Sequence, residues 1–393
     1  MTHSLTASEN SRLLFWSRVR EFAVPTSMIE SATARRAVGD WAGACAAAHV
    51  DVDLDLREVA RTQGHLLARQ VRADLRQFAP DLLRGHFARI MPDGLLRPDL
   101  TVSLANYDAI HLVARTPPAW ASAGQRISIA LWGAGLPHQS HPDRRFRLDL
   151  HRHLWDARRT GELWSRSGTG LDHWLAEAEL LLRTEGRPNG PVVVRLGSRQ
   201  RLLVDPSTST CGPAPARLRT RDGPLLPHAA TWPPLDLELL DAGLLDVGQL
   251  HPLIAPHHRR TSPQQATDAR LVDCRGATHG IGLMNGVLVP LDHDAEELRR
   301  EELLMALGGN GLPCLRAIDE AHRQPECLVD VRARIDHGDT AGALATVEGL
   351  LGPFVLERSD ALRNEFEKAV LGRVSHGLFR AGLARPLADS TPR

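Results

Sequence analysis

The spacing of the apolar residues changes at the turn Pro92-Asp93-Gly94, and this change limits the folds open to the chain. Before the turn, from Leu13 to Leu83, apolar residues recur at the spacing of a helix with one buried face. After it come short alternating runs, at Leu100 to Ala105, Ile110 to Ala114 and Arg126 to Trp132, which are typical of antiparallel strands. We therefore predict an α+β fold with a helical N-terminal part and a central antiparallel sheet.

The rest of the chain predicts helices around the sheet, a connection, and a second structured part. Helical spacing covers Leu148 to Trp164 and His173 to Thr184, and a hairpin is predicted from Pro191 to Val204. Asn285-Gly286, between two apolar runs, predicts a C-terminal β-hairpin, and helical spacing then predicts a helical bundle to the end. The predicted parts are a helical part at 1–94, an α+β sheet domain at 95–205, a Pro-rich connection with a short helix at 206–270, and the hairpin with the helical bundle at 271–393.

One short motif, a Gly-Asp pair before an Ala-rich segment, occurs twice. The segment from Arg35 to Ala46 contains Gly39 and Asp40, and the segment from Arg334 to Ala345 contains Gly338 and Asp339. We expect each Gly to supply the positive φ of a tight turn and each Asp to cap the next helix. The turn is similar to that of a tetratricopeptide hairpin, but the period of about 34 residues is absent. A generic helical hairpin and a degenerate repeat module are therefore both open.

The charge balance narrows the choice of partners. Lys and Arg number 47 and Asp and Glu also number 47, so a globally basic nucleic-acid-binding surface is not expected. The stretch from Arg183 to Arg221 is locally basic, and the segment from Asp292 to Glu302 is locally acidic. A protein partner fits this pattern better than nucleic acid or a membrane. Lys368 is the only lysine, and Ala follows it, which excludes a P-loop lysine.

Cysteine usage and hydropathy indicate a soluble protein of the cytoplasm. The five cysteines are an odd number and form no CxxC pair, as is common in reduced chains. The N-terminal segment lacks the apolar core of a secretory signal, and no apolar run approaches the length of a membrane span. The abundance of Arg and Ala with a single lysine suggests a bacterium with a GC-rich genome.

Several readable catalytic motifs are missing. The chain has no GxSxG nucleophile elbow and no HExxH zinc motif. Asp51, Asp53 and Asp55 alternate as in a calcium loop, but Leu and Thr occupy the positions where such a loop needs Gly and Glu. We read these aspartates as an acidic edge, with a paired-aspartate metal site as the weaker alternative. The eight tryptophans predict core packing, with a ligand-stacking pocket as the alternative.

The most site-like stretch runs from Cys274 to Glu297. If Asn285-Gly286 is the hairpin turn, residues whose numbers sum to about 571 lie opposite one another, which brings His279 close to His293 and Cys274 to the level of Glu297. A thiol, two imidazoles and carboxylates suit a zinc site or a nucleophile with its base. The candidate catalytic residues are Cys274, His279, His293 and Glu297, and the candidate metal ligands are Cys274, His279, Asp292 and His293.

The competing interpretation of this stretch is a plain hairpin whose polar side chains face solvent. Asp292 or Asp294 would then cap the helix that begins near Glu296, and Asp294 with Glu297 fits a capping box. We prefer this interpretation at the level of sequence, so no cofactor is expected and zinc is the alternative. The expected function is accordingly a cytoplasmic, non-catalytic interaction or regulatory protein, with a metal- or cysteine-dependent hydrolase at residues 274–297 as the alternative.

Overall fold

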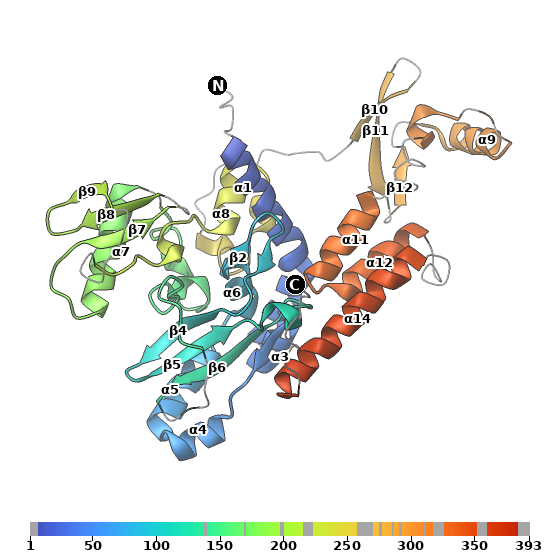
Figure 1. Ribbon diagram of the computed structural model, residues 1–393. Coiled ribbons are helices and arrows are strands. Elements are labelled where there is room, and N and C mark those ends of the chain that lie inside the picture. Colours follow the sequence, from blue (N-terminus) through green and yellow to red (C-terminus); the bar gives the residue numbers. More distant parts are fainter. Residues whose placement is uncertain are drawn as a thin grey trace, which may run out of the picture. The chain divides into compact units, whose positions relative to one another are not determined.

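The computed structural model shows the α+β fold that the sequence predicts (Figure 1). It describes residues 7–134, 136, 140–168, 170–196, 200–214, 223–257, 270–274, 277–284, 287–290, 293–307, 309, 311–316, 326–351 and 360–383. Two compact units divide the chain. Unit 1 comprises Met1–Ser262 and Ser375–Arg393, and unit 2 comprises Pro263–Val374.

The first part of unit 1 is helical, as the spacing of its apolar residues predicts. Its helices are α1 (Ala7–Arg18), α2 (Thr26–Ala37), α3 (Trp41–Ala47), α4 (Leu56–Thr62), α5 (His65–Leu75) and α6 (Pro80–His86), with a π-helical turn η1 (Val19–Ala23) after α1. Local residues set the helix starts. Pro25 precedes α2, Pro80 occupies the first turn of α6, and the Asp55 carboxylate accepts a hydrogen bond from the Arg57 amide at the start of α4.

The central sheet contains the three predicted antiparallel strands and one strand that the sequence analysis missed. The strands β4 (Thr101–Tyr107), β5 (Ile110–Arg115) and β6 (Ile127–Gly133) pair antiparallel, and β1 (Val50–Val52) joins the edge parallel to β6. The strand order is β1-β6-β5-β4, so the three predicted antiparallel strands are joined by one parallel edge strand and the sheet is mixed. Only three residues form β1, which is too short for an alternating pattern to be recognised.

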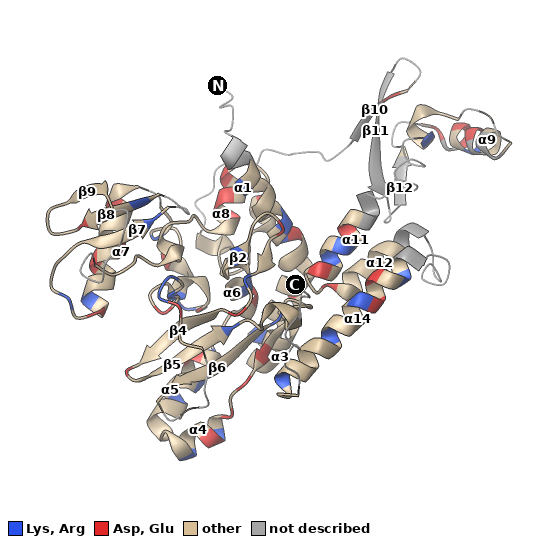
Figure 2. Ribbon diagram, in the orientation of Figure 1, with Lys and Arg blue, Asp and Glu red and all other residues tan. Residues whose placement is uncertain are grey.

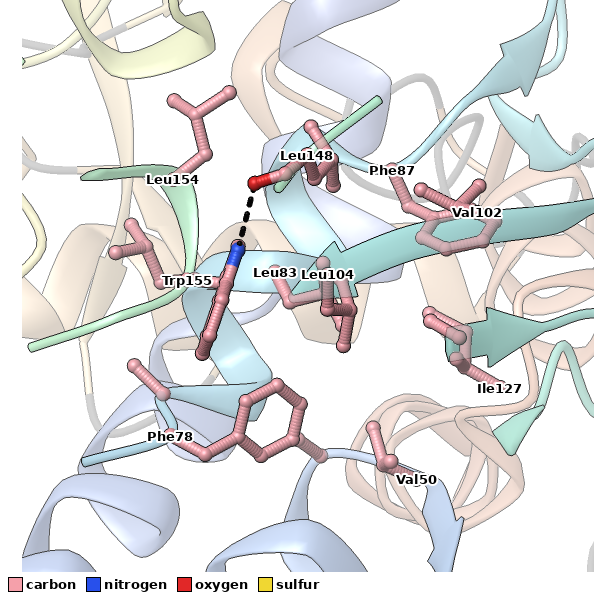
Figure 3. Close-up of a cluster of buried hydrophobic side chains, with 14 of the residues drawn as sticks. Val50, Phe78, Leu83, Phe87, Val102, Leu104, Ile127, Leu148, Leu154 and Trp155 are labelled. Carbon is pink, nitrogen blue, oxygen red and sulfur yellow. Dashed lines mark hydrogen bonds between the residues drawn. The ribbon is translucent and has the colours of Figure 1, made fainter. Parts of the chain in front are cut away.

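The core of unit 1 lies between this sheet and the helices, around Trp155 (Figure 3). The indole of Trp155 is fully buried, and its Nε1 donates to the Leu148 carbonyl at 3.0 Å. The ring of Phe78 lies 6.0 Å from it, centroid to centroid, and Leu104 of β4 and Ile127 of β6 are also fully buried in this core. Trp155 thus combines a large apolar area with a satisfied polar atom.

The segment predicted as a helix from Leu148 to Trp164 is instead irregular. It contains two single 3₁₀ turns, η3 (Arg152–Leu154) and η4 (Thr160–Glu162). The Asp156 carboxylate accepts from the amide of Arg158 and from the guanidinium groups of Arg152 and Arg158, which favours a turn over a helix. The next predicted helix is confirmed as α7 (Leu171–Thr184).

A second small sheet follows α7. The predicted hairpin is present as β7 (Val192–Arg195) and β8 (Arg201–Asp205), and a third strand, β9 (Thr210–Pro213), pairs with β8. Residues 197–199, where the predicted hairpin turn falls, lie outside the described residues. The predicted Pro-rich connection therefore begins with a strand, because β9 pairs with the edge of β8 that β7 leaves open.

The Pro-rich stretch also contributes to the interior of unit 1. The predicted short helix is α8 (Leu235–Asp241), and this stretch also contains the 3₁₀ turns η6 (His228–Ala230), η7 (Val247–Gln249) and η8 (Ala255–His257). Another 3₁₀ turn, η2 (Ala119–Ala121), lies between β5 and β6. His251 lies 2.8 Å from the fully buried Asp81 carboxylate of α6, with Arg36 at 3.3 Å. Burial raises the pKa of Asp81, but the hydrogen bond with His251 and the charge of Arg36 outweigh it, so that pKa lies below its usual value.

Unit 2 begins with a three-stranded antiparallel sheet and continues with helices (Figure 1). Its elements are β10 (Arg270–Cys274), β11 (Ala277–Met284), β12 (Val287–Pro290), α9 (Ala295–Ala306), α11 (Glu326–Asp336), α12 (Thr340–Leu351) and α14 (Asp360–Arg380), whose last residues belong to unit 1. Acidic and basic residues alternate along α9 and α14 (Figure 2). None of the helices within the described residues is long and apolar enough to cross a membrane.

The two Gly-Asp motifs form the same turn. Gly39 between α2 and α3 has φ +78°, and Gly338 between α11 and α12 has φ +88°. The Asp40 carboxylate accepts from the Gly43 amide at 2.8 Å, and the Asp339 carboxylate accepts from the Gly342 amide at 2.9 Å. Both the positive φ and the helix cap predicted from the sequence are therefore confirmed at both places.

The two turns also agree in their backbone hydrogen bonds and ion pairs. The Asp40 amide donates to the Arg35 carbonyl, and the Asp339 amide donates to the Arg334 carbonyl, as in a Schellman motif. Each arginine also forms an ion pair with its aspartate, at 2.9 Å for Arg35 and 3.3 Å for Arg334. The same turn geometry between two helices therefore occurs once in each unit.

Candidate metal centre

Four side chains with metal-binding atoms converge in unit 2. Cys274 ends β10, His279 lies on β11, His293 lies just before α9, and Cys314 lies in the helical turn at 313–316. One ligand-type atom from each of the four lies within 4.8 Å of all the others. Elements far apart in the sequence therefore bring two thiols and two imidazoles to one point.

Two hairpins position the first three residues. In β11 and β12 Ile281 pairs with Pro290 and Met284 with Val287, which confirms the register expected for a turn at residues 285–286. The turn residues themselves lie outside the described residues. Because β12 ends just before His293, that register carries His293 back to the level of His279.

The position of Cys274 in this sheet differs from the one predicted from the sequence. The sequence predicts Cys274 opposite position 297 on the far side of one long hairpin. The chain instead reverses after Cys274, and Cys274 pairs with Ala277 in a separate β10–β11 hairpin. The reversal leaves the thiol on the strand next to His279, within the ligand cluster.

The two imidazoles face one another, and a carboxylate supports one of them. His279 Nδ1 lies 2.7 Å from His293 Nε2. On the other side of its ring, His293 Nδ1 lies 3.2 Å from the Glu297 carboxylate of α9. A carboxylate on the far nitrogen of a histidine is the usual support of a metal-binding imidazole, because it fixes the ring and its tautomer.

The thiols are buried in a small apolar cluster. Cys274 is 1% exposed and Cys314 is fully buried, and they pack with the buried Leu312. Leu298 and Leu315 cover the cluster from outside. Among the described residues the cluster has three buried side chains, and the burial of these three alone contributes little free energy of folding.

The spacing of the four atoms fits a tetrahedral metal ion. Zinc bound to sulfur at roughly 2.3 Å and to nitrogen at roughly 2.0–2.1 Å separates neighbouring ligand atoms by roughly 3.3–3.8 Å. The observed atoms lie within 4.8 Å of one another, and the two imidazole nitrogens lie at 2.7 Å. The two imidazole nitrogens are closer than two ligands of one ion would be, so they have to separate when a metal binds.

The structure therefore brings together most, but not all, of the predicted site residues. Cys274, His279, His293 and Glu297 lie at one centre. Asp292 lies outside the described residues. Cys314 was missed, because it follows α9 at a distance in sequence that no hairpin register reaches. The only signal for it was its residue type, a second cysteine after the helix.

The alternating aspartates have a different role from metal binding. Asp51 forms a bidentate pair with Arg126, with the shorter contact at 2.6 Å, and Asp53 lies 3.1 Å from Arg115. Arg380, at the end of α14, contacts both carboxylates. With arginines bound to Asp51 and Asp53, and Asp55 capping α4, these oxygens are already used, which agrees with the preferred interpretation of an acidic edge.

Comparison of the chain with protein-family models, with curated proteins and with solved structures finds no match. The function of the chain must therefore be inferred from the chemistry of its own residues. The Cys274–His279–His293–Cys314 cluster, called the metal centre below, provides the most specific chemistry.

Proposed function

We propose that this chain is a cytoplasmic, non-catalytic protein-interaction or regulatory protein whose unit 2 folds around a structural zinc ion. The observation that carries the proposal is the convergence of Cys274, His279, His293 and Cys314 within 4.8 Å. Four protein ligands complete a tetrahedral coordination shell, and a catalytic zinc needs one position for water or substrate. The centre therefore suits a structural role.

The ligand set favours zinc over other common ions. Thiolates and imidazoles bind zinc well, whereas calcium and magnesium prefer oxygen ligands. The hydrogen bond between Glu297 and His293 supplies the outer support expected for a zinc-bound imidazole. A reducing cytoplasm would keep both cysteines available as thiolates rather than as a disulfide.

The hydrolase alternative has less support. Cys274 is 1% exposed, so a substrate cannot reach its sulfur without opening the site. The Glu297 carboxylate is bound to the far nitrogen of His293, where it orients the ring. A general base would instead have to lie within hydrogen-bond reach of a metal-bound water.

The expected partner is a protein. Unit 2 exposes large apolar side chains at the C-terminal end of α9, with Leu303 61% exposed on the helix and Leu307 86% exposed directly after it. Exposed apolar side chains that gather on one helix are typical of an interaction surface. The helical hairpins built on Gly39-Asp40 and Gly338-Asp339 add further helical faces of the kind that bind protein segments.

Metal analysis of untagged protein tests the zinc ion. We expect about one zinc per chain by inductively coupled plasma mass spectrometry, because the four residues form one closed site. Cys314→Ser and His279→Ala should each lose the metal. Cys211→Ser is the matched control, since Cys211 is exposed on β9 and should leave the zinc content unchanged. Metal-free wild-type protein, or full zinc in both site variants, would contradict the proposal.

Cobalt substitution separates the structural role from the hydrolase alternative. Co²⁺ in a closed site with two thiolates and two imidazoles gives an intense tetrahedral visible spectrum that added azide does not change. In a catalytic site, azide would displace a bound water and alter the spectrum. An azide-sensitive spectrum would overturn the structural assignment and favour the hydrolase.

A further inference from the structure

Unit 1 contains a cavity whose lining includes none of the four residues of the metal centre. It has a volume of about 310 Å³ and lies beside the C-terminal half of α1, the strand β2 (Arg89–Ile90) and the turn η6. Aromatic rings provide much of its wall: Phe15, Trp16, Phe87, Phe146 and Trp232. Small-molecule sites are typically apolar clefts of roughly 300–1,000 Å³, so this cavity has the size for a ligand of one or two rings.

A second, smaller cavity shares part of its lining with the first. It has a volume of about 180 Å³ and shares the side chains of His228 and Trp232 with the larger one. These two rings stack, with centroids 5.2 Å apart and planes at 27°. The ring of Phe146 lies 5.4 Å from His228 on another side. The two cavities therefore meet at a platform of flat side chains.

The charged residues around both cavities have one sign. Arg89, Arg97 and Arg166 line the larger cavity, and Arg145 and Arg195 line the smaller one. Among the described residues that line either cavity, none is acidic. Such a surface attracts anions, because its positive field is not compensated locally.

The arginines differ in whether a carboxylate already pairs with their guanidinium group. Arg166 forms a bidentate pair with Glu177, at 2.8 and 2.6 Å. Arg89 donates to the backbone carbonyls of Gly94 and Arg84, which leaves its net charge uncompensated. Arg97 is exposed, and within the described part of the chain it has no ion pair. Arg97 is thus the guanidinium best placed to take a new anion.

The state of His228 agrees with a cationic environment. Its pKa is lowered to about 4 by burial and then by the charges of Arg145, Arg97 and Arg195. The imidazole is therefore neutral near pH 7 and stacks as an uncharged ring. Burial is the main cause of this shift, and the smaller contributions of the three arginines show that their charges reach the ring.

We propose that these joined cavities, here called the aromatic–arginine site, bind a small organic acid. Its flat apolar body would lie on the His228–Trp232 stack and against Phe146, and its acid group would lie against Arg97 and Arg145. Neither the zinc ion nor the interaction role proposed above is needed for this inference, because every residue involved belongs to unit 1.

A pair of fluorescent probes tests the proposal. The anionic probe 8-anilinonaphthalene-1-sulfonate and the neutral N-phenyl-1-naphthylamine share the same ring system and differ in the sulfonate. We expect saturable binding of the anionic probe to the folded chain, near one per chain, and about tenfold weaker binding of the neutral probe, as for loss of one charge-assisted contact. Equal affinity for the two probes would overturn the assignment of an acid-binding site.

Two variants and a control locate the binding. Arg97→Gln should weaken the anionic probe roughly three- to tenfold and leave the neutral probe unchanged. Ala229→Trp, which places an indole in the larger cavity, should abolish binding of both probes, with near-ultraviolet circular dichroism as the check on folding. Arg69→Gln, on an exposed arginine of α5, should change neither. If Arg97→Gln binds the anionic probe like the wild type, the proposal is wrong.

Discussion

The two units of this chain differ in how their interiors are built. In unit 1, apolar residues from the first helices, the central sheet and the segment 235–254 form one large buried cluster, and α7 with β7 and β8 forms a second, smaller one. In unit 2 the described residues form two small clusters, one of five buried residues between α11, α12 and α14, and one around Cys274, Leu312 and Cys314. The first unit can be stabilised by apolar burial, whereas the sheet of the second needs a different source of stability.

Few of the described residues around the metal centre are buried apolar side chains. Burial of apolar surface contributes roughly 25 cal/mol per Å², and Leu312 is the one buried aliphatic side chain that the described residues place in this cluster. Zinc binding to a site of this kind contributes on the order of 10–16 kcal/mol in small zinc modules, much of it as free energy of folding. We therefore expect metal removal to destabilise unit 2 but not unit 1, and a mutation in the core of unit 1 to destabilise unit 1 but not unit 2.

The largest effect is expected from metal removal. Treatment with a strong chelator should unfold β10–β12 and the start of α9, because their stability depends on the zinc ion. Hydrogen exchange followed by mass spectrometry should show lost amide protection in these strands. The strands β4–β6 of unit 1 are the internal control and should keep their protection. Added zinc should restore the amide protection of β10–β12. Unchanged protection in these strands after chelation would show that their stability does not depend on zinc.

The converse change is Trp155→Ala in the core of unit 1. This side chain is fully buried, so its truncation leaves a cavity and should lower the free energy of unfolding of unit 1 by about 3–5 kcal/mol. Denaturant unfolding of unit 1 followed by tryptophan fluorescence measures the loss. Zinc content should remain that of the wild type. A variant that loses its zinc along with its stability would show that the units are not independent.

How far the sequence could predict this structure depends on the range of the contacts involved. Helix and strand spacing, the Asn285-Gly286 register and the Gly-Asp turns rest on neighbouring residues, and the structure confirms them. The parallel pairing of Val50 with Ile127 depends on packing between distant segments, which no local pattern records. The participation of Cys314 in the metal centre has the same cause.

The irregular segment from 148 to 164 shows a further limit. Leu148, Leu154 and Trp155 are buried at spacings that resemble a helix, but they pack from turns that the Asp156 carboxylate stabilises. Apolar spacing reports which residues are buried. It does not report the backbone that buries them when side-chain hydrogen bonds compete with a helix.

The paired turns allow a direct comparison at matched positions in the two units. Gly39→Val and Gly338→Val each force a β-branched residue into positive φ, which costs about 1–3 kcal/mol. At Gly39 an added Cβ meets no atom within 4 Å, so backbone strain rather than a clash sets the cost there. Thermal unfolding should show similar losses, in unit 1 for the first variant and in unit 2 for the second.

Asparagine provides the control for these two turns. Gly39→Asn and Gly338→Asn should cost less than the valine variants, because asparagine tolerates the left-handed region better than other residues do. If valine and asparagine were equally damaging, the loss would not come from backbone conformation. A large difference between the two valine variants would show that the matched geometry hides different packing around the turns.

The smallest effect concerns pH and belongs to unit 1. Burial, together with His151 and Arg166, lowers the pKa of His153 to about 2, and His86 and Glu177 also face this ring. In the unfolded chain a histidine titrates near about 6.5. Between these values the unfolded state binds more protons, so stability falls as the pH falls. Moving from pH 7 to pH 5 should cost about 1–2 kcal/mol for this one histidine.

Urea unfolding at pH 7 and pH 5 measures this loss. His153→Gln removes the titrating group, so the difference in unfolding free energy between the two pH values should shrink by about 1–2 kcal/mol relative to the wild type. His65→Gln, on an exposed histidine at the start of α5, should leave that difference unchanged. If His153→Gln and the wild type lose the same stability on acidification, His153 is not held neutral by burial, and the acid sensitivity of unit 1 has another source.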